Sequence, residues 1–432
     1  MHSFKTGSLP IWRLRRGMDR RFRAGHPWVY SNELFDSPKG VDPGALVELR
    51  DSGGKFLARG FGNPKSLISF RALSRDEQMI RPDSVESVVQ TLLHSRQLRI
   101  LSGFEGFSYR LCFGEVDQLP GLVIDRFAVG DGQVFVIQAH SAGANRLMLQ
   151  GLEILESYVK KAQEAGTWAK TAVVLRNDPS VRKLEGLTED VPVVLRSIPH
   201  LDLSAAQIRV RAMGSQSILF HVDLLQGQKT GFFLDQFANI QLAAMRFEKL
   251  NFTSQIRILD LCCYVGQWGA QLAQFFKQRG FSVSVLAVDT SQVALDRAKK
   301  NVEAQGASCE LLQANVLKDL GQLPDQSFDL IISDPPAFIP SRKDIPQGSH
   351  AYLQLNTQVF RILKPGGGVV CCSCSALLDE DAFTQILAKS ARRNAAVVQW
   401  IGRGAASPDH PMMMEFPEGR YLKSWMGIHS IF

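Results

Sequence analysis

The sequence predicts an α/β protein that ends in a Rossmann-like, doubly wound parallel sheet and begins with a small β-barrel module and a small α+β domain. Its 432 residues are too many for one ordinary domain. Short apolar runs separated by turn residues fill the first 76 positions. From residue 257 onward, strand-like and helix-like segments alternate, which indicates a parallel sheet. We therefore expect three domains, at residues 8–76, 77–205 and 206–432.

The first module is predicted from four short strand-like runs, at residues 28–30, 46–49, 56–61 and 67–70. An arginine-rich first strand precedes them. Its six arginines are Arg13, Arg15, Arg16, Arg20, Arg21 and Arg23. With Phe22, Trp28 and Tyr30 interleaved, they suit an arm that contacts nucleic-acid phosphates and bases. The alternative is a solvated charged face above aromatic residues that belong to the core.

The middle domain combines helices with a sheet. We expect helices at residues 84–102 and about 142–164, because apolar residues recur there at helical spacing. Strand-like runs lie at 109–113, 121–126, 134–138 and 172–176. This segment contains no obvious pair of nucleophile and base.

The last domain is predicted to begin with two strands, a polar loop at 228–236 and a helix at 237–248. The two strands span 208–213 and 217–222. Further strands are expected at 257–262, 283–288, 309–313, 329–333 and 367–373, with helices at 267–279, 291–305 and 349–363. Right-handed crossovers bring the carboxyl ends of parallel strands to one edge, which Asp260, Asp289, Asn315 and Asp334 should line.

A glycine turn between Asp260 and Gly269 follows the first of these parallel strands. Gly266 and Gly269 allow the backbone to turn and to approach a ligand, so strand, turn and helix form a nucleotide-sized pocket. Asp289 ends the next strand, where an acid accepts hydrogen bonds from ribose hydroxyls. The spacing is not G-x-G-x-x-G, which disfavours a dinucleotide. An ordinary strand-to-helix turn is the alternative.

Two further strand ends carry reactive groups. Asp334-Pro335-Pro336 stiffens one loop, so the Asp334 carboxylate can be held against a planar ring on which Phe338 stacks. Cys374 lies at the carboxyl end of the next strand between two serines, where a thiol with a lowered pKa is a nucleophile. A rigid loop without a ligand and a small packed cysteine are the alternatives.

Composition limits the function classes. A hydrophobic content of 45% and a charged content of 21% describe a globular protein, and the net charge of +7 suits a polyanionic partner. No apolar run is long enough to span a membrane, and the N-terminus lacks a secretory signal. The seven cysteines include adjacent pairs but no C-x-x-C, so we expect no metal site and free thiols in a reducing cytoplasm.

Together these stretches resemble a known family. They are 23–30, 114–126, 228–236, 259–269, 334–336 and 373–375, and in the tail Asp409-His410-Pro411, Glu418 and 421–423. In this combination and order the chain is similar to the bacterial ribosomal RNA cytosine-5 methyltransferases. Those join an N-terminal PUA domain to a Rossmann-like class I methyltransferase domain that uses S-adenosylmethionine.

The resemblance implies roles for individual residues. S-adenosylmethionine would be bound by Phe233, Asp260, Cys262, Tyr264, Gly266, Gly269, Asp289, Asn315 and Asp334. Large-subunit ribosomal RNA would be contacted by six residues: Arg13, Arg15, Arg23, His26, Trp28 and Lys229. Asp334 would also hold the flipped cytosine, and Cys374 would be the nucleophile. The oligomeric state is left open, with a homodimer as one option.

The chemistry itself argues for a thiol. Cytosine C5 is a poor nucleophile, and thiolate addition at C6 makes C5 enamine-like so that it can attack a sulfonium methyl group. Methylation of an amino group or of guanine N7 needs no such thiol. The base must leave its stack to reach the pocket.

The chain departs from the family pattern at two places. Phe237-Ala238-Asn239-Ile240 replaces an Arg-x-Asn-Arg run, and Asn315 replaces an acid that contacts adenine. Asp334-Pro335-Pro336 also carries no second cysteine, so the group that removes the C5 proton is not identified. Two other functions stay open: a guanine methyltransferase with Cys374 merely packed, and an RNA-binding assembly protein without activity.

Overall fold

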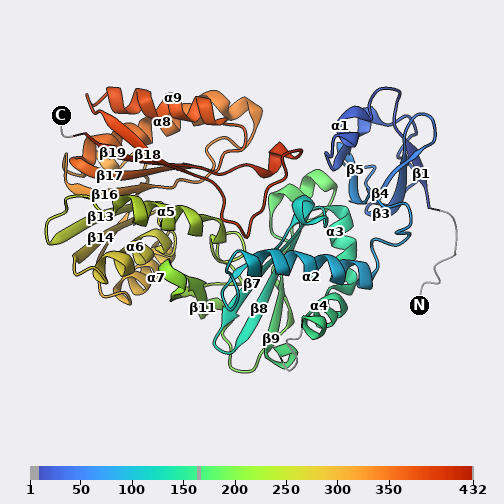
Figure 1. Ribbon diagram of the computed structural model, residues 1–432, viewed down its shortest axis with the longest axis horizontal. Helices are drawn as coiled ribbons and strands as arrows, with labels where there is room; N and C mark the ends of the chain where they lie inside the picture. Colours follow the sequence, from blue (N-terminus) through green and yellow to red (C-terminus); the bar gives the residue numbers. More distant parts are fainter. Residues whose placement is uncertain (1–8, 163–166, 431–432) are drawn as a thin grey trace. The chain divides into compact units, whose positions relative to one another are not determined.

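The computed structural model describes residues 9–162 and 167–430, which form two compact units (Figure 1). Unit 1 contains the chain up to Ala206 with the segments Asp223–Gly231 and Asp409–Gly419. Unit 2 contains Gln207–Val222, Phe232–Pro408 and the chain from Arg420 onward. Two segments of the predicted third domain thus pack in unit 1. The three predicted domain boundaries themselves stay predictions.

The N-terminal part of unit 1 is a five-stranded sheet in the order β1-β3-β4-β5-β2. Its strands are β1 (Ile11–Arg13), β2 (Trp28–Tyr30), β3 (Ala45–Arg50), β4 (Phe56–Gly62) and β5 (Ile68–Ser74). The four strand-like runs of the predicted barrel module are therefore confirmed.

The predicted arginine-rich first strand is wrong over most of its length. Only Ile11–Arg13 is a strand, and Arg20–Arg23 forms the short helix α1. Gly17 lies in the left-handed region at φ 80°, which turns the chain between the two elements. The helix buries Phe22, whose ring meets Phe70 edge-on at 6.0 Å, so core packing overrides the extended pattern.

In the middle part of unit 1, four strands of a larger sheet are paired in the order β10-β9-β8-β7, and β6 also pairs with β7. The elements are α2 (Val85–Leu101), β6 (Tyr109–Phe113), β7 (Leu122–Val129), β8 (Gly132–Ala139), β9 (Thr171–Leu175) and β10 (Val193–Arg196). Helix α2 and all four predicted strands are confirmed, and β10 was not expected.

The helix predicted at 142–164 is interrupted. It consists of α3 (Ala142–Leu147), a 3₁₀ turn at Met148–Gln150 and α4 (Gly151–Lys161). Gln150 has φ −111° and ψ 18°, which breaks the α-helical hydrogen bonding just before Gly151. Residues 163 and 164 of the prediction lie outside the described residues.

Unit 2 begins with the paired strands β11 (Ala206–Arg211) and β12 (Ser217–Val222), followed by helix α5 (Phe237–Phe247). Its large sheet has the order β15-β14-β13-β16-β17-β19-β18. The parallel strands are β13 (Gln255–Leu261), β14 (Ser282–Asp289), β15 (Ser308–Gln313), β16 (Phe328–Ser333) and β17 (Leu363–Ser373). All five match predicted strands. The strand order reverses at β13, which is where open α/β sheets bind ligands.

The helices of unit 2 cover both faces of this sheet, as a doubly wound fold requires. Figure 1 shows α8 (Ile345–Ile362) and α9 (Glu380–Arg392) on one face, and α5, α6 (Gln267–Lys277) and α7 (Gln292–Glu303) on the other. A buried apolar cluster from β13 to α9 fills the space under α8 and α9. Burial of this cluster, at about 25 cal/mol for each Å² of apolar surface, holds the strand ends in place.

Two strands at the far edge of the sheet were not expected. The strand β19 (Lys423–His429) runs antiparallel between β17 and β18 (Val398–Gly404). The alternation of strand and helix stops after α9, so local periodicity carried no signal for them. Among the described residues, no helix is long and apolar enough to cross a membrane.

Candidate active site

The polar side chains predicted at one sheet edge of unit 2 do meet there. Leu261 of β13 lies opposite Val288 of β14 and Ser333 of β16. The next residues along these strands are Cys262, Asp289 and Asp334, which therefore leave the sheet side by side. On β17, Cys371 lies opposite Ser333, so Cys374 emerges at the same edge.

The turn after β13 has an unusual backbone. Cys262, Tyr264 and Gly266 all lie in the left-handed region, with φ of 59°, 50° and 76°. Two of these residues carry side chains, for which such a conformation is costly and is retained mainly at functional sites. The turn is held by the bond from Tyr264 N to Asp289 Oδ2, 3.0 Å long. Phe233 adds an edge-on ring contact to Tyr264, with the centroids 5.4 Å apart.

The two glycines of the turn are required by space as well as by conformation. A Cβ added at Gly266 would lie 3.0 Å from the Cα of Ala298 in α7. A Cβ added at Gly269 would lie 3.0 Å from Val285 and 3.2 Å from Asp260 Oδ2. Helix α6 therefore begins in close contact with α7, β14 and the end of β13.

Asp260 is buried under this turn, and only one of its carboxyl oxygens is satisfied. Oδ2 accepts a hydrogen bond from Gly269 N at 2.9 Å, whereas Oδ1 is buried without a hydrogen-bond partner among the described residues. Burial raises the pKa of Asp260 to about 7, and the charges of Asp334 and Asp289 act in the same direction. A buried acceptor without a donor is costly, and it suits a cationic or N–H ligand group.

Asp289 and Asn315 are both partly engaged in loop contacts. The Asp289 carboxylate accepts from Tyr264 N and, at 3.0 Å, from Ser291 N. A carboxylate has about four acceptor sites, so further bonds to hydroxyl groups remain open. Asn315 is exposed, and its Oδ1 accepts from Leu317 N at 2.9 Å in a local turn. Its predicted contact to adenine stays a prediction.

Asp334 is held by two residues for which the sequence suggested no role. Gln236 Nε2 and Trp268 Nε1 donate to the same oxygen, Oδ2, at 2.8 and 3.1 Å. Asn239 Nδ2 in turn donates to Gln236 Oε1 at 2.7 Å. The carboxylate is therefore fixed in orientation by a chain of donors. Both donors lie in stretches that matched the family, which was the only signal for them.

Cys374 is half-buried one residue beyond the end of β17. Its Sγ lies 3.8 Å from the carbonyl oxygen of Pro335, which links it to the Asp334 loop. Ser375 Oγ accepts from Ile339 N at 3.2 Å and bonds the Tyr352 hydroxyl at 2.9 Å, which anchors the chain just after the thiol. All seven cysteines are free thiols, and Cys374 and Cys262 are the two that are not fully buried.

The predicted RNA-contacting arginines are mostly paired with acids of unit 1. Arg13 pairs with Asp36 at 2.8 Å, and Arg23 pairs with Asp19 and Asp51 at 2.5 and 2.6 Å. Arg15 donates to the carbonyl of Leu34 at 2.8 Å. By contrast Arg16 and Arg20 are exposed and have no ion pair in the part of the chain that the structure describes.

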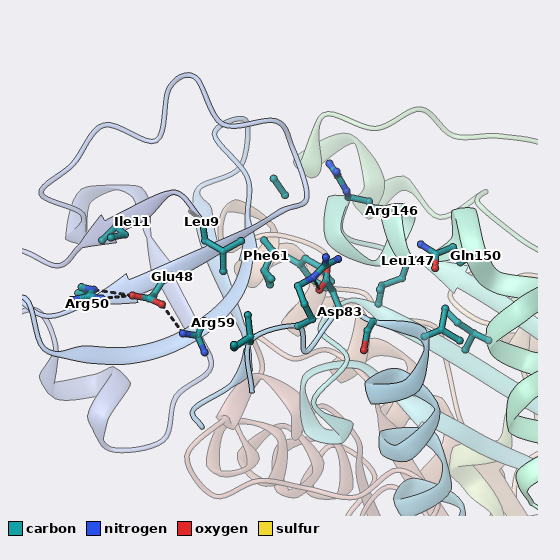
Figure 2. A pocket seen from close by; sticks show the side chains of 17 residues that line it. Leu9, Ile11, Glu48, Arg50, Arg59, Phe61, Asp83, Arg146, Leu147 and Gln150 are labelled. Carbon is teal, nitrogen blue, oxygen red and sulfur yellow. Dashed lines mark hydrogen bonds and ion pairs between the residues drawn. The ribbon is translucent and has the colours of Figure 1, made fainter. Parts of the chain in front are cut away.

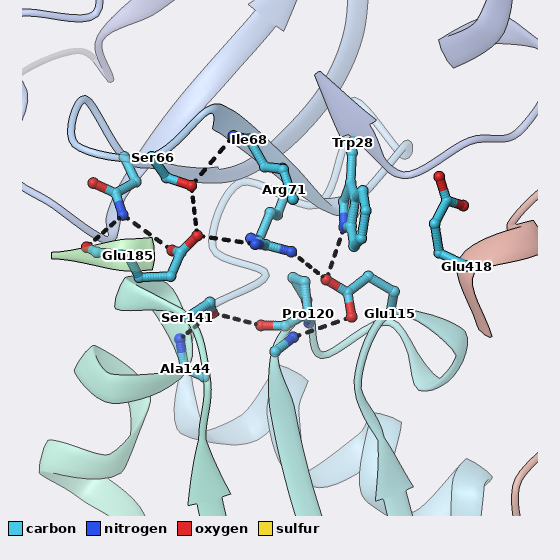
Figure 3. A network of polar contacts seen from close by, with 12 residues as sticks. Trp28, Ser66, Ile68, Arg71, Glu115, Pro120, Ser141, Ala144, Glu185 and Glu418 are labelled. Atoms are coloured by element: carbon cyan, nitrogen blue, oxygen red, sulfur yellow. Dashed lines mark hydrogen bonds and ion pairs between the residues drawn. The ribbon is translucent and has the colours of Figure 1, made fainter. Parts of the chain in front are cut away.

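His26 and Trp28 are also occupied within unit 1. His26 is buried beside Glu418, at 3.3 Å, and Trp28 Nε1 donates to Glu115 at 2.8 Å in the network of Figure 3. Arg71 bridges Glu115 and Glu185 there, at 2.7 and 2.9 Å. Lys229 is exposed, with its backbone at φ 53°. RNA contacts by these residues stay predictions.

A separate pocket of about 980 Å³ lies in unit 1, between strands β3 and β4 and helices α2 to α4 (Figure 2). Apolar side chains line much of it. Among its charged residues, Glu48 pairs with Arg50 and Arg59, and Arg81 pairs with Asp83. It contains none of the residues predicted to bind a cofactor or to react. The sheet edge of unit 2 is therefore the better candidate for the active site.

Comparisons with known proteins identify the two kinds of domain in the chain. Residues 13–75 match the model of a PUA-like domain, and residues 252–418 match that of a methyltransferase domain. The chain is 32% identical over 424 residues to ribosomal RNA large subunit methyltransferase I of Photobacterium profundum, covering 95% of this chain and 97% of the relative. The protein of that name from Klebsiella pneumoniae is 31% identical over 430 residues, covering 97% and 98%.

Solved structures show the same fold. One is "a putative methyltransferase complexed with SAH", with a TM-score of 0.72 and 16% identity, covering 97% of this chain and 100% of that one. Another is "a putative SAM-dependent methyltransferase from Streptococcus mutans", with a TM-score of 0.70, 16% identity and the same coverage. The predicted fold class, with a PUA-like module before a Rossmann-like methyltransferase domain, is confirmed.

Proposed function

Because this chain belongs to the family of ribosomal RNA large subunit methyltransferases I, we propose that it methylates C5 of a cytosine in large-subunit ribosomal RNA, with S-adenosylmethionine as the methyl donor. The observation that carries the cytosine-5 assignment is the meeting of Cys374 with the Asp334-Pro335 loop, where Sγ lies 3.8 Å from Pro335 O. A guanine methyltransferase has no chemical use for that thiol.

The residues at the sheet edge fit S-adenosylmethionine. The buried Oδ1 of Asp260 lacks a hydrogen-bond partner among the described residues, and the methionine ammonium group would supply one. Asp289 has acceptor capacity left for the ribose hydroxyls. Gly266 and Gly269 let α7 and β14 pack directly against the turn that would hold the cofactor. The cofactor supplies an electrophilic methyl group on a positively charged sulfur.

Cys374 carries the covalent step. Its thiolate would form a bond to C6 of the cytosine, and the electron pair of the C5–C6 double bond would then bond C5 to the methyl group while the methyl–sulfur bond breaks and the sulfur leaves as a neutral thioether. A base then removes the C5 proton, the double bond reforms and the C6–S bond breaks, which returns the thiolate. The positions of Asp334 and Cys374 at neighbouring strand ends allow one flipped base to reach both.

Asp334 orients the base. Its Oδ2 is fixed by Gln236 and Trp268, so the carboxylate presents a defined edge to the cytosine. A carboxylate accepts from the exocyclic amino group of cytosine. Adenine and cytosine both offer such a group, but a cytosine ring also places C6 where a thiolate can add.

The test is methyl transfer from labelled S-adenosylmethionine to deproteinised ribosomal RNA and to ribosomal assembly particles, with nucleoside analysis. Label should appear in 5-methylcytidine, and Cys374→Ala should lower the rate by roughly a thousand-fold or more because the covalent step is lost. Cys309→Ala, which removes another thiol of the same sheet, is the control and should keep its activity.

Other outcomes would contradict the proposal. Label in a guanosine, unaffected by Cys374→Ala, would assign the protein as a guanine methyltransferase.

A second experiment uses RNA that contains 5-fluorocytidine. It should trap the wild-type protein covalently, because fluorine at C5 blocks the last step. Binding of RNA without trapping or label would assign an assembly factor.

A further inference from the structure

We propose that Lys423 is a positioning residue whose buried ammonium group stabilises the thiolate form of Cys374. The proposal deepens the function proposed above and rests on Cys374 being the nucleophile. It concerns a residue that lies 49 positions after the thiol in the sequence and reaches it only through the antiparallel pairing of β19 with β17.

The fold places the lysine at the end of the thiol's own strand. In the pairing of β17 with β19, Lys423 lies opposite Ser373, the residue before Cys374. Its side chain is 7% exposed, and Nζ donates to Ser375 O at 3.0 Å and to Tyr421 O at 2.9 Å. The ammonium group is therefore fixed against the carbonyl of the residue after Cys374. Cys374 therefore lies between Ser373, which is opposite the lysine, and Ser375, whose carbonyl oxygen the lysine contacts.

A buried ammonium needs compensation, and two carbonyls provide only part of it. Taking such a charge out of water costs several kcal/mol unless an anion or several dipoles replace the hydration. Burial lowers the pKa of Lys423, and the negative form of Cys374 is the first of the neighbouring charges that oppose this, before Glu380 and Asp379. The thiolate and the ammonium therefore stabilise each other.

The surroundings of the thiol otherwise oppose its ionisation. Asp260, Asp289 and Asp334 line the same edge. Burial raises the pKa of the neighbouring Cys262, and the negative charges of these three acids act in the same direction. Cys372 and Tyr352 also lie close enough to Cys374 for their charges to interact with it. An unperturbed thiol with a pKa near 8.5 is a few per cent thiolate at pH 7. A fixed cation at this point counters the carboxylates and raises that fraction.

A purely structural lysine would account for the same hydrogen bonds, so the test must measure the thiol itself. The full-length protein, without RNA or cofactor, is treated with iodoacetamide at pH 5.5 to 10, and alkylation of Cys374 is quantified by peptide mass spectrometry. The midpoint of the pH profile should rise by about one unit or more in Lys423→Met, which is roughly a tenfold loss of thiolate at pH 7. Lys423→Arg should restore much of it.

The matched control is Lys364→Met, which removes a partly buried lysine of β17 that pairs with Asp329 at 2.7 Å. Its Cys374 profile should equal that of the wild type. An unchanged midpoint in folded Lys423→Met would overturn the proposal. If that variant fails to fold, the wild-type profile decides: a Cys374 midpoint well above 8.5 would show that the lysine does not offset the neighbouring carboxylates, and would overturn the proposal.

Methyl transfer separates this proposal from the one on which it rests. In Lys423→Met the rate at pH 7 should fall roughly tenfold. It should recover as the pH is raised toward 9, because a larger fraction of Cys374 is then deprotonated without the lysine. Formation of 5-methylcytidine that needs Cys374 but shows no such profile would remove the role of Lys423 alone. Methylation that does not need Cys374 would remove the proposed function, whatever the alkylation profile.

Discussion

At the residue scale, the buried carboxyl group of Asp260 marks the place where a ligand is expected to bind. It lies at the end of β13, fully buried, with one oxygen bonded to Gly269 N and the other without a partner among the described residues. Its pKa is raised to about 7 by burial, and the charges of Asp334 and Asp289 add to the effect. Such a group is destabilising in the free protein, and bound S-adenosylmethionine would relieve it.

The free energy of unfolding should depend on pH through the protonation of Asp260. Since the pKa is raised above its unfolded value near 3.9, the folded state binds the proton more tightly, and the free energy of unfolding falls as the pH rises from about 4 to about 7. Each pKa unit is worth about 1.4 kcal/mol. Asp260→Asn should therefore flatten the difference in stability between pH 5.5 and pH 8, measured by denaturant unfolding.

The control for this prediction is Asp296→Asn, an exposed carboxylate of α7, which should leave the profile unchanged. A wild-type profile that is already flat, or one that Asp260→Asn leaves as steep as before, would show that the carboxyl group is not destabilised by burial.

At the scale of elements, the turn between β13 and α6 has little room for a larger side chain. The helix begins at Gln267, directly after Gly266 in a left-handed conformation, and Gly266 packs against the backbone of α7. Elsewhere in unit 2, Gly280 has a similar φ of 88° but open space around its missing Cβ. The two glycines therefore differ only in what surrounds them.

This pair permits a matched prediction. Gly280→Ala should cost about 1 kcal/mol, the price of a side chain in the left-handed region. Gly266→Ala should cost a further ~1–3 kcal/mol, because the methyl group meets α7, and it should weaken S-adenosylmethionine binding, measured by calorimetry. Equal stability and equal affinity in the two variants would show that the close approach of α6 to α7 is not needed.

For the molecule as a whole, the net charge of +7 suits RNA, but the structure distributes that charge differently from the sequence-based expectation. Arg13 and Arg23 are neutralised by aspartates, whereas Arg16 and Arg20 are exposed and have no ion pair within the described ranges. Exposed cations release more counterions on binding phosphates than cations that must first leave a carboxylate.

The salt dependence of RNA binding should separate the two pairs. Arg16→Ala with Arg20→Ala should reduce the slope of log K against log salt by about 1.4 for single-stranded RNA, at about 0.7 per phosphate contact. Arg13→Ala with Arg23→Ala should reduce it by less than half as much. A larger reduction in the second pair would restore the assignment made from the sequence.

Much of the site could be predicted because it depends on local pattern and general topology. Apolar runs, turns and helices can be predicted from residues that are close together in the chain. Parallel crossovers then bring Asp260, Asp289, Asp334 and Cys374 to one edge of the sheet. The confirmed strands β13 to β17 show this. The arginine-rich segment failed the same test, because Phe22 packs into a core that local alternation does not reveal.

The sequence by itself determined the fold class, the glycine turn and the residues at the sheet edge, since each is encoded by residues close together in the chain. Only the tertiary structure decided that Gln236 and Trp268 orient Asp334, and that β19 brings Lys423 opposite Ser373, the residue before Cys374. Those contacts join residues far apart in the sequence. The physical reason is that burial and charge pairing depend on which distant elements pack together, and no periodicity within one element specifies that choice.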